Sequence, residues 1–494
     1  MRLHLFAAAT ALTLVLAGCA NSGGLRPDGS PIDPSTLKAE RSLAGLNLSP
    51  AAWPTQDWWS GLGDPQLTTL IGEALQDNPG LAIADARARQ AQAEVGVADA
   101  ARGPTVNGGA SVAGARLPDG LLSPESHFAA AKYGYASFNW GLDLWGGKRA
   151  AWQAALGQAR AAEIEARAAR IELSSNVARA YVQLGYAYTQ QDLAKAELAR
   201  ANKARQLTGQ RVAAGIDSQL QLKQNDSEVA SAEREQAVAN RAIDAARSAM
   251  SVLLGKGPDR GLDIGRPQTL TSAALTVPTN LPVELLGHRA DLVAARWRVE
   301  AAGKDIKVAK TEFLPNVNLG AMAGLLSLGG GNLFQASSRF YEFGPTLSLP
   351  IFDGGRLRAN LSGKDAQYDI AVAQYNQTLV SALNQVADEI AAQQSLDQQL
   401  AAQQRALDAA RQAWDLAQQR YQAGVGSYLE ALSVRQQLLL AEQAMAALQA
   451  QHVDLSIQLI QALGGGYRPE DQSDRGGYQP QASDAAPSSP SSHS

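Results

Sequence analysis

Two long stretches of the chain carry apolar residues at alternating three- and four-residue steps and contain no proline. No proline occurs between Pro124 and Pro258, and none between Pro350 and Pro469. Steps that average 3.5 residues place the apolar side chains on one stripe of a helix, where they pack against neighbouring helices. As one helix, residues 149–214 would be roughly 100 Å long. Such a length predicts a coiled coil or a fibrous or tubular assembly.

The two stretches are copies of one another. Residues 211–218 (RVAAGIDS) align with residues 420–427 (RYQAGVGS), and each segment breaks its helical pattern at a glycine, Gly215 or Gly424. The same shift carries the apolar stripe of the first copy (Leu222, Asn225, Val229, Ala232, Gln236, Ala239, Ile243, Ala246, Met250, Leu253) onto that of the second (Ala431, Val434, Leu438, Ala441, Met445, Leu448, His452, Leu455, Leu459, Ala462). The coincidence predicts an internal duplication.

A different pattern precedes each long helix. Apolar residues there alternate with polar or small ones, which is typical of strands with two unlike faces. The apolar positions are Val106, Ala110 and Val112; Ala136, Phe138, Trp140, Leu142 and Leu144; Val317, Leu319 and Ala321; and Phe343, Leu347, Leu349 and Ile351. A membrane β-barrel and an ordinary sandwich sheet both fit this pattern, with polar loops at residues 116–132 and 326–340.

The start of the chain reads as a targeting segment. A positive residue, Arg2, precedes an apolar run from Leu3 to Leu16, and the small residues Ala17 and Gly18 lead to Cys19. A secretory signal has this layout, and the site resembles the bacterial lipobox. The resemblance implies that Cys19 becomes the lipidated first residue. A transmembrane anchor is the alternative, but the run is shorter than the ~20 residues that span a bilayer.

The lipid signal favours the barrel. Open sheet edges are not tolerated in hydrocarbon, and four strands cannot close a barrel alone. Two chains would supply about eight strands and three about twelve, both within the range of known barrels.

Composition narrows the function further. The chain has 494 residues, 45% of them hydrophobic but only 6% aromatic, which suits narrow, closely packed helices. Its single cysteine leaves none for a disulfide or a Cys-based metal site. A net charge of −4 gives no basic surface for nucleic acid. Residues 21–50 and 468–494, rich in Pro, Ser, Gly, Asp and Gln, are expected to be a flexible leader and a disordered tail.

Candidate chemistry is sparse. The five histidines lack metal-ligand spacing, and His452 falls in the apolar stripe, where a satisfied polar residue is expected. Gly329-Gly330-Gly331 has no following lysine and therefore does not form a phosphate-binding loop. We predict no enzyme activity, no metal and no cofactor.

The order of these features resembles one family. The lipobox, Trp58-Trp59, residues 63–67 (GDPQL), two strand pairs and two Arg-x-x-x-Gly-x-x-Ser breaks look like the TolC-type outer membrane factors. Within them the chain resembles the efflux lipoproteins of the nodulation-protein-T-like group. The opening of the second copy, residues 287–295, also fits, with Arg289-Ala290-Asp291 where Arg-Pro-Asp is usual. The resemblance covers about residues 53–467.

The resemblance implies a mainly α fold with β: a homotrimer whose twelve-stranded outer membrane barrel, four strands per chain, continues into a long α-helical coiled-coil periplasmic tunnel. It also implies a periplasmic adaptor and an inner-membrane pump of the resistance-nodulation-division, major-facilitator or aryl-acid exporter class. The predicted segments are a signal peptide (1–18), a lipidated leader and linker (19–60), a first repeat (61–260, hairpin about 104–144), a connector (261–281), a second repeat (282–467, hairpin about 315–352) and a disordered tail (468–494).

The family also implies where the duct narrows. Residues at the periplasmic tip that match the family's constriction are Tyr421, Leu429, Glu430, Ser433 and Gln221. Gly426 replaces a bonding arginine, and Gln221 an aspartate, of the best-known member, so we expect closure to rely on Leu429 packing more than on salt bridges. Asp143 and Glu342 fall at polar positions of the alternating pattern, so they are expected to face the lumen and, with Glu430 at the tip, to favour cations modestly.

Three functions remain open: a passive outer membrane duct that exports small amphipathic compounds, a duct for type I protein secretion, and a coiled-coil lipoprotein scaffold without a channel. The alternating strands argue against the scaffold, which does not need them. The lipobox argues against the secretion duct, since secretion members of the family are usually not lipidated.

Overall fold

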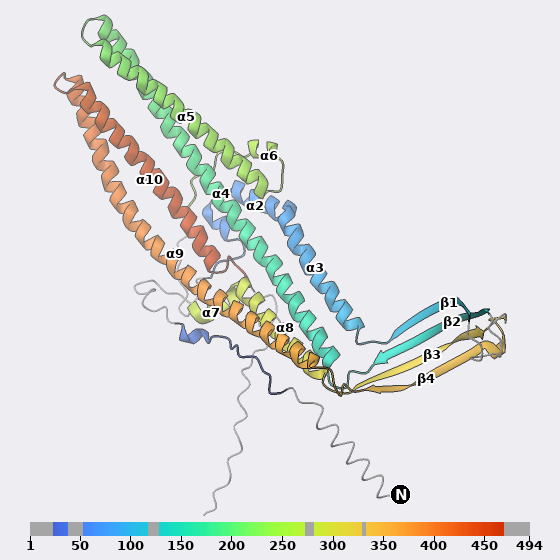
Figure 1. Ribbon diagram of the computed structural model, residues 1–494. Helices are drawn as coiled ribbons and strands as arrows, with labels where there is room; N and C mark the ends of the chain where they lie inside the picture. The colour runs from blue at the N-terminus through green and yellow to red at the C-terminus, as the bar shows by residue number, and fades with distance from the viewer. Residues whose placement is uncertain (1–22, 38–52, 117–127, 272–280, 329–331, 469–494) are drawn as a thin grey trace, which may run out of the picture. The chain divides into compact units, whose positions relative to one another are not determined.

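The computed structural model describes residues 23–37, 53–116, 128–271, 281–328 and 332–468 (Figure 1). The signal peptide, Cys19 and the tail from residue 469 onward lie outside these ranges. The α-helices are α2 (Pro65–Asp77), α3 (Pro79–Ala100), α4 (Gly147–Ala213), α5 (Gln219–Leu253), α6 (Asp259–Leu262), α7 (Leu281–His288), α8 (Ala290–Thr311), α9 (Arg356–Gln422) and α10 (Tyr428–Ala462). The strands are β1 (Thr105–Arg116), β2 (Phe128–Gly141), β3 (Asn316–Leu328) and β4 (Arg339–Ser348), and short 3₁₀ helices are η1 (Pro34–Thr36), η2 (Trp58–Leu62) and η3 (Ala336–Ser338).

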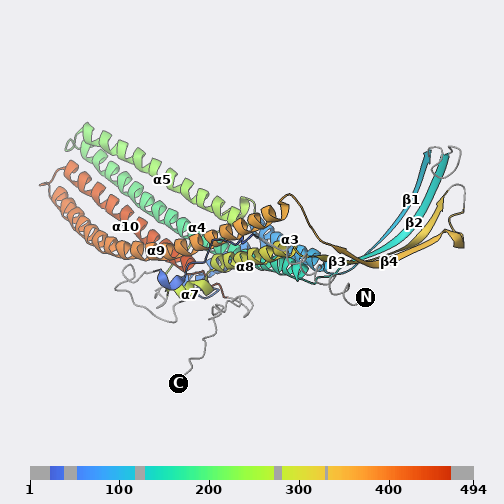
Figure 2. The ribbon, with the colours of Figure 1, turned by 60° about the horizontal axis from the view of Figure 1, so that its bottom comes forward.

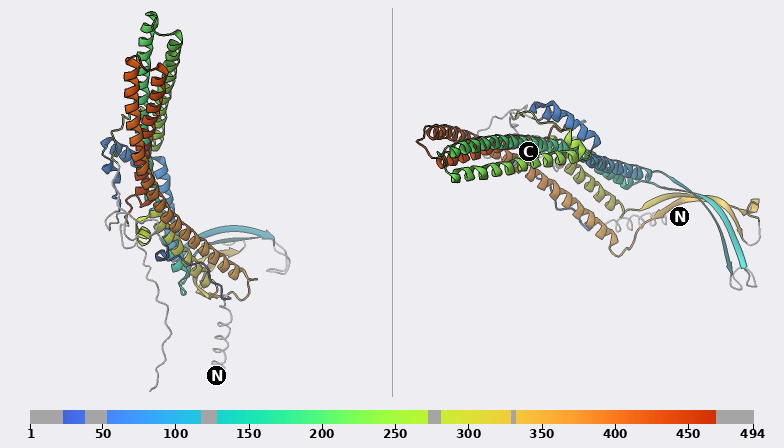
Figure 3. Two further views of the ribbon diagram at one scale, coloured as in Figure 1. Left: turned by 90° about the vertical axis from the view of Figure 1, so that its left-hand side faces the viewer. Right: turned by 90° about the horizontal axis from the view of Figure 1, so that it is seen from above.

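The helices confirm the predicted duplication. Helices α4 and α9 each have 67 residues, and α5 and α10 each have 35. Each long helix turns back into its shorter partner to form a hairpin, and both hairpins appear side by side in Figures 1 and 3. Most residues of the predicted stripe are buried, among them Ala232, Ile243 and Met250 in α5 and Leu438 and Met445 in α10.

The strands form one antiparallel sheet in the order β1-β2-β3-β4 (Figure 2). Directly paired residues point to the same face of a sheet, so the register shows how the two faces differ. Val106 pairs with Phe138, which pairs with Ala321, which pairs with Phe343. At the helix-proximal end of the sheet, the opposite face carries polar and small residues (Asn107, Ser137, Asn139, Asn318 and Glu342). There one face is apolar and the other polar, as the alternation predicted, whereas Tyr133, Leu326 and Phe340 lie on the second face nearer the strand-connecting loops.

Three of the four described strands are longer than the pattern indicated. They contain 12, 14, 13 and 10 residues, although the sequence suggested about ten. The predicted loop at 116–132 was too long, because β2 already begins at Phe128. The second predicted loop, 326–340, was also too long, because β3 extends to Leu328. At the start of β2, the three consecutive alanines 129–131 pair with β1 but give no alternation.

The chain divides into two compact units, and these are not the two repeats. Of the described residues, one unit contains 23–37, 78–116, 128–170, 294–328 and 332–382, including the sheet; the other contains 53–77, 171–271, 281–293 and 383–468, including both helical turns. Each unit therefore draws on both copies, and α4 and α9 each continue from one unit into the other. Within the described ranges, no helix has the length and apolarity needed to cross a membrane.

The family-like motif at residues 63–67 has a structural role in the unit that holds the turns. Asp64, only 4% exposed, accepts hydrogen bonds from the Tyr181 hydroxyl (2.6 Å) and from the backbone N–H groups of Gln66 (2.9 Å) and Gln268 (2.9 Å). Burial raises the pKa of Tyr181, and its bond to Asp64 raises that pKa further. The motif thus joins the start of α2 to α4 and to the segment after α6.

The leader departs from its prediction. Residues 23–37, expected to be flexible, lie against α9 within the unit that holds the sheet. The backbone N–H of Gly29 donates to Asp369 Oδ1 (2.7 Å), and that of Ile32 donates to Asn376 Oδ1 (2.8 Å). Leu25 packs on a cluster that includes Phe313 and Leu361. The sequence pattern missed this docking because backbone groups make most of it.

Candidate channel entrance

The turn between α4 and α5 is stabilised by its own residues. Gly215 adopts a positive φ of 70°, which ends α4 without the steric cost of a β-carbon. Ser218 and Gln221 form a capping box, in which each side chain bonds the backbone N–H of the other residue. Arg211 donates to both oxygens of Asp217, at 2.7 and 3.1 Å. The turn therefore closes without help from the second hairpin.

The turn between α9 and α10 has the same backbone conformation as the first turn but weaker local bonds. Gly424 has a φ of 75°, and Ser427 Oγ accepts the N–H of Glu430 (3.1 Å). Arg420 has no aspartate beside it, because Gly426 stands at the position of Asp217. Instead it lies 3.8 Å from Glu430 in an exposed ion pair, an arrangement worth little in water.

Two tyrosines of this second turn reach the first hairpin. The Tyr421 ring lies 5.9 Å from the Arg211 guanidinium and 5.8 Å from the ring of Tyr428. Burial raises the pKa of the Tyr421 hydroxyl, and Asp217 raises it further. The contact is a cation–π interaction, which favours the hairpins lying together.

The hydroxyl group of Tyr428 makes the main neutral polar contact between the hairpins. It donates to Asn225 Oδ1 (2.6 Å) and lies 3.0 Å from Glu228 Oε1. Asn225 is fully buried, and its amide nitrogen donates to Thr208 Oγ1 (3.1 Å) and to the carbonyl of Gln221 (2.9 Å). Burial raises the pKa of Tyr428, and Glu228 raises it further. The hydroxyl thus stays protonated and keeps donating.

Charged groups continue this contact along the helices. Arg200 in α4 bridges Glu197 (2.7 Å) and Glu228 of α5 (3.0 Å), while Arg435 in α10 bonds Glu197 (2.9 Å) and lies 3.5 Å from Glu442. Their side chains are only 11–22% exposed. Burial alone would raise the pKa of Glu197, but Arg200 and Arg435 hold it below its ordinary value. We call Asn225, Tyr428, Glu228, Arg200, Glu197 and Arg435 the inter-hairpin network.

The predicted constriction residues fall into three settings. Tyr421 contacts the first hairpin, Gln221 is engaged in the cap of α5, and Glu430 pairs with Arg420. Leu429 is 57% exposed, and Ser433, one turn further along α10, is also exposed. The structure brings the residues together at the two turns, but only Tyr421 among them touches both hairpins.

The two predicted lumen acids differ in their surroundings. Glu342 lies on the polar face of β4, opposite Met322. Asp143 lies beyond the end of β2, and its carboxylate accepts the backbone N–H groups of Lys148 (2.9 Å) and Arg149 (2.8 Å). It satisfies donors in the first turn of α4, where an anion is favoured.

Sequence reasoning missed the inter-hairpin network. One signal pointed to it: Asn225 is a polar residue in an otherwise apolar stripe, a substitution that often fixes the register of packed helices. Its counterpart in the second copy is Val434. The charged members carried no signal, since a charge on a helix is usually solvated.

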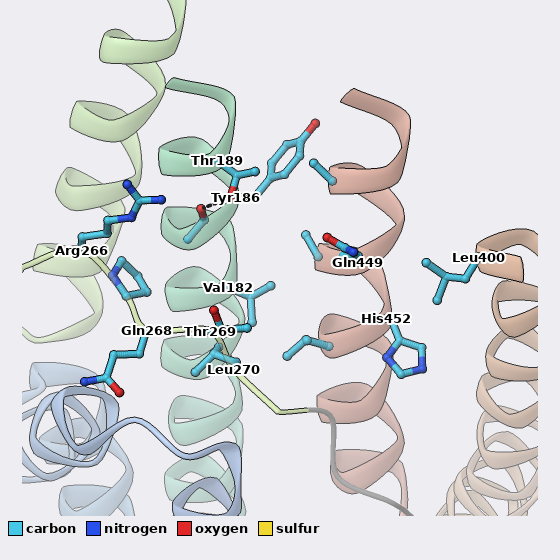
Figure 4. A pocket seen from close by; sticks show the side chains of 15 residues that line it. Val182, Tyr186, Thr189, Arg266, Gln268, Thr269, Leu270, Leu400, Gln449 and His452 are labelled. Atoms are coloured by element: carbon cyan, nitrogen blue, oxygen red, sulfur yellow. Dashed lines mark hydrogen bonds between the residues drawn. The ribbon is translucent and has the colours of Figure 1, made fainter. Parts of the chain in front are cut away.

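The unit that contains the two helical turns also contains a cavity of about 450 Å³ between α4, α10 and residues 266–270 (Figure 4). Both basic side chains in its wall have acidic partners: Arg266 lies against Asp192, and His452 lies 3.2 Å from Asp397. The cavity therefore presents amide and hydroxyl groups, such as those of Gln449 and Thr189, among aliphatic side chains. None of the predicted constriction residues lines it.

Comparisons with known proteins agree with the fold and the duplication. The model of the family "Outer membrane efflux protein" matches residues 70–256 and again residues 281–465. The chain is 37% identical to the fusaric acid resistance protein FusA of Burkholderia cepacia over 73% of this chain and 69% of that protein. It is 31% identical to the multidrug resistance outer membrane protein MdtP of Escherichia coli, over 92% of this chain and 95% of that protein.

A solved structure shows the same architecture. The outer membrane protein VceC of Vibrio cholerae superposes with a TM-score of 0.77 at 37% identity, covering 84% of this chain and all of that one. The lipoprotein subgroup is not established by these relatives. The two family matches fall on the two copies read from the sequence, and together they span most of the chain. The chain belongs to the outer membrane efflux protein family and has the TolC-type channel fold.

Proposed function

We propose that three copies of this chain form the outer membrane duct of a tripartite efflux system. The observation that carries the proposal is the four-stranded sheet, with one apolar and one polar face. Its two edge strands, β1 and β4, lack a partner on their outer sides among the described strands. A sheet with open edges cannot stand in lipid, whereas twelve strands from three chains form a closed barrel around a polar lumen.

The duct would pass small amphipathic compounds. The names of relatives refer to fusaric acid, to multidrug resistance and to solvent efflux. We infer a similar cargo class here, driven by an inner-membrane pump and handed over by a periplasmic adaptor. A photo-crosslinker at Val425, which is 70% exposed at the second turn, should capture the adaptor in cells; failure from several exposed turn positions would argue against tip-to-tip docking.

We propose that the helical turns form the closed periplasmic entrance. The inter-hairpin network holds each second hairpin against the first, and the exposed Leu429 narrows the opening where three copies meet. Single-channel recordings in planar bilayers test this. Leu429→Ala should raise the closed-state conductance, whereas Leu440→Ala, which truncates a leucine of similar exposure (55% against 57%) on the same helix, should leave it unchanged. Equal conductance of Leu429→Ala and the unmodified protein would contradict the role of Leu429.

Ion selectivity separates the two lumen acids. Glu342→Gln should reduce the preference for cations, because its carboxylate lies on the polar face of the sheet. Asp143→Asn should change selectivity less, since the Asp143 carboxylate already accepts two backbone hydrogen bonds at the start of α4. Reversal potentials in a salt gradient measure both. A larger effect of Asp143 would show that its charge reaches the lumen.

We also propose that Cys19 is lipidated. Since a twelve-stranded barrel already holds the protein in the membrane, the acyl chains assist sorting and trimer insertion. Intact mass should show the acyl groups, and Cys19→Ser should still yield trimers in smaller amount. Complete loss of Cys19→Ser to the periplasm would contradict the barrel.

A further inference from the structure

The docked leader lies over a group of carboxylates, and its contacts with α9 do not compensate their negative charge. The three residue-to-residue steps from Gly29 to Ile32 advance about 10 Å when extended. Two turns of α9, from Asp369 to Asn376, advance about the same distance. The leader therefore follows α9 in step and bonds it once at each end of this span. At Gly29 the approach is close, because a β-carbon there would lie 2.9 Å from Asp369 Oδ1.

Asp365 lies one turn before Asp369 on α9 and is only 6% exposed. Within the described residues, neither of its carboxylate oxygens has a hydrogen-bond partner. A second and a third acid, Asp369 and the leader's Asp28, both act on it electrostatically. The one cation that opposes them is Lys310 on α8, which is itself exposed.

The lysine next to Asp365 does not compensate this excess of negative charge. Lys364, next to Asp365 in the chain, faces Asp305 at 4.0 Å. A bound metal is not indicated either, since the described residues contain no group of three or more histidine, cysteine or acidic side chains placed to hold one. Burying an unpaired carboxylate is costly, and such groups usually take up a proton instead.

We infer that docking of the leader onto α9 is coupled to the uptake of a proton by Asp365. The inference concerns the leader alone and does not depend on the proposed transport function. Burial raises the pKa of Asp365, and Asp369 and Asp28 raise it further against the opposing effect of Lys310. Asp365 lies on α9 between Leu361, whose cluster Leu25 packs on, and Asp369, which Gly29 bonds, so release of the leader exposes the carboxyl and lowers its pKa towards the ordinary value. Docking is then tightest in acid and weakens as the pH rises from the ordinary aspartate value through the raised one.

Hydrogen exchange of the full-length protein in detergent tests the coupling. The readout is the protection of the Gly29 and Ile32 amides, corrected for the intrinsic pH dependence of exchange, at several pH values from below the ordinary aspartate pKa up to neutral. In the unmodified protein this protection should fall measurably as the pH rises across that range. Asp365→Asn should remove the pH dependence, because the amide does not titrate.

Two variants control the experiment. Asp415→Asn, which changes an exposed aspartate elsewhere on α9, should behave like the unmodified protein. Asn376→Ala removes the anchor of Ile32, so it should lower protection at every pH while keeping the pH dependence. Flat protection in the unmodified protein, or unchanged pH dependence in Asp365→Asn, would overturn the inference. So would a change in protection on adding calcium or a chelator at constant pH, which would identify a cation in place of the proton.

Discussion

The two helical turns share a backbone and differ in what stabilises it. Both follow a 67-residue helix, both pass through a left-handed glycine and both begin the next helix at a capping serine. In the first turn Asp217 binds Arg211, and that turn is complete by itself. In the second, glycine replaces this aspartate, and two tyrosines replace Val212 and Gln219.

The difference changes what each turn depends on. The second turn gains contacts to the first hairpin through Tyr421 and Tyr428, while its own ion pair is exposed and long. The duplication thus produced two copies of one helical hairpin, and a few substitutions made the second turn depend on contacts with the first hairpin. In the entrance proposed above, opening would require one element to separate from another, and this asymmetry would provide such an element.

The largest expected effect comes from the centre of the inter-hairpin network. Arg435→Met takes from Glu197 and Glu442 a cation that is only 11% exposed, although Glu197 keeps its contact with Arg200. Breaking a buried pair typically costs about 3–5 kcal/mol, and because Arg200 remains we expect a value at the lower end of that range. We expect a lower thermal unfolding midpoint by circular dichroism and a higher closed-state conductance.

The matched control for this variant is Arg411→Met. Arg411 lies 3.9 Å from Asp408, and both side chains are 53% exposed. Exposed pairs contribute about 0–1 kcal/mol, so the unfolding midpoint should barely move. If the two variants shifted it equally, the network would contribute no more than a surface pair.

A smaller effect should follow from removing one hydroxyl. Tyr428→Phe keeps the ring but deprives the buried Asn225 and Glu228 of a donor, which costs about 1–3 kcal/mol. Tyr421→Phe should cost less, because the Tyr421 ring contacts to Arg211 and Tyr428 survive the change. Conductance and unfolding measurements on both variants rank the two tyrosines, and a larger effect of Tyr421→Phe would place the main contact at the outer end of the turn.

The same asymmetry explains which structural features could be predicted from the sequence and which could not. Helices, strands and their faces follow from periodicity, which is a local property, so the duplicated frame and the two-faced sheet were predictable. Tyr428 and Asn225 are 203 positions apart, and no local pattern shows which residues of two helices meet. Asp143 was assigned by the alternation of the strand before it, although an acid ahead of a helix start is equally a capping signal.

The smallest expected effect compares the local bonds of the two turns. Asp217→Asn removes one charge of the Arg211 pair, in which Asp217 is 6% exposed, whereas Glu430→Gln removes a charge from a pair whose side chains are about half exposed. Asp217→Asn should therefore speed amide exchange in residues 214–218 more than Glu430→Gln speeds it in residues 423–427. High salt should weaken the effect of Glu430→Gln more than that of Asp217→Asn, since exposed charges are screened more strongly. If Glu430→Gln loosened its turn more, the second turn would rest on its own ion pair rather than on the first hairpin, and the dependence of one copy on the other would have to be sought elsewhere along α10.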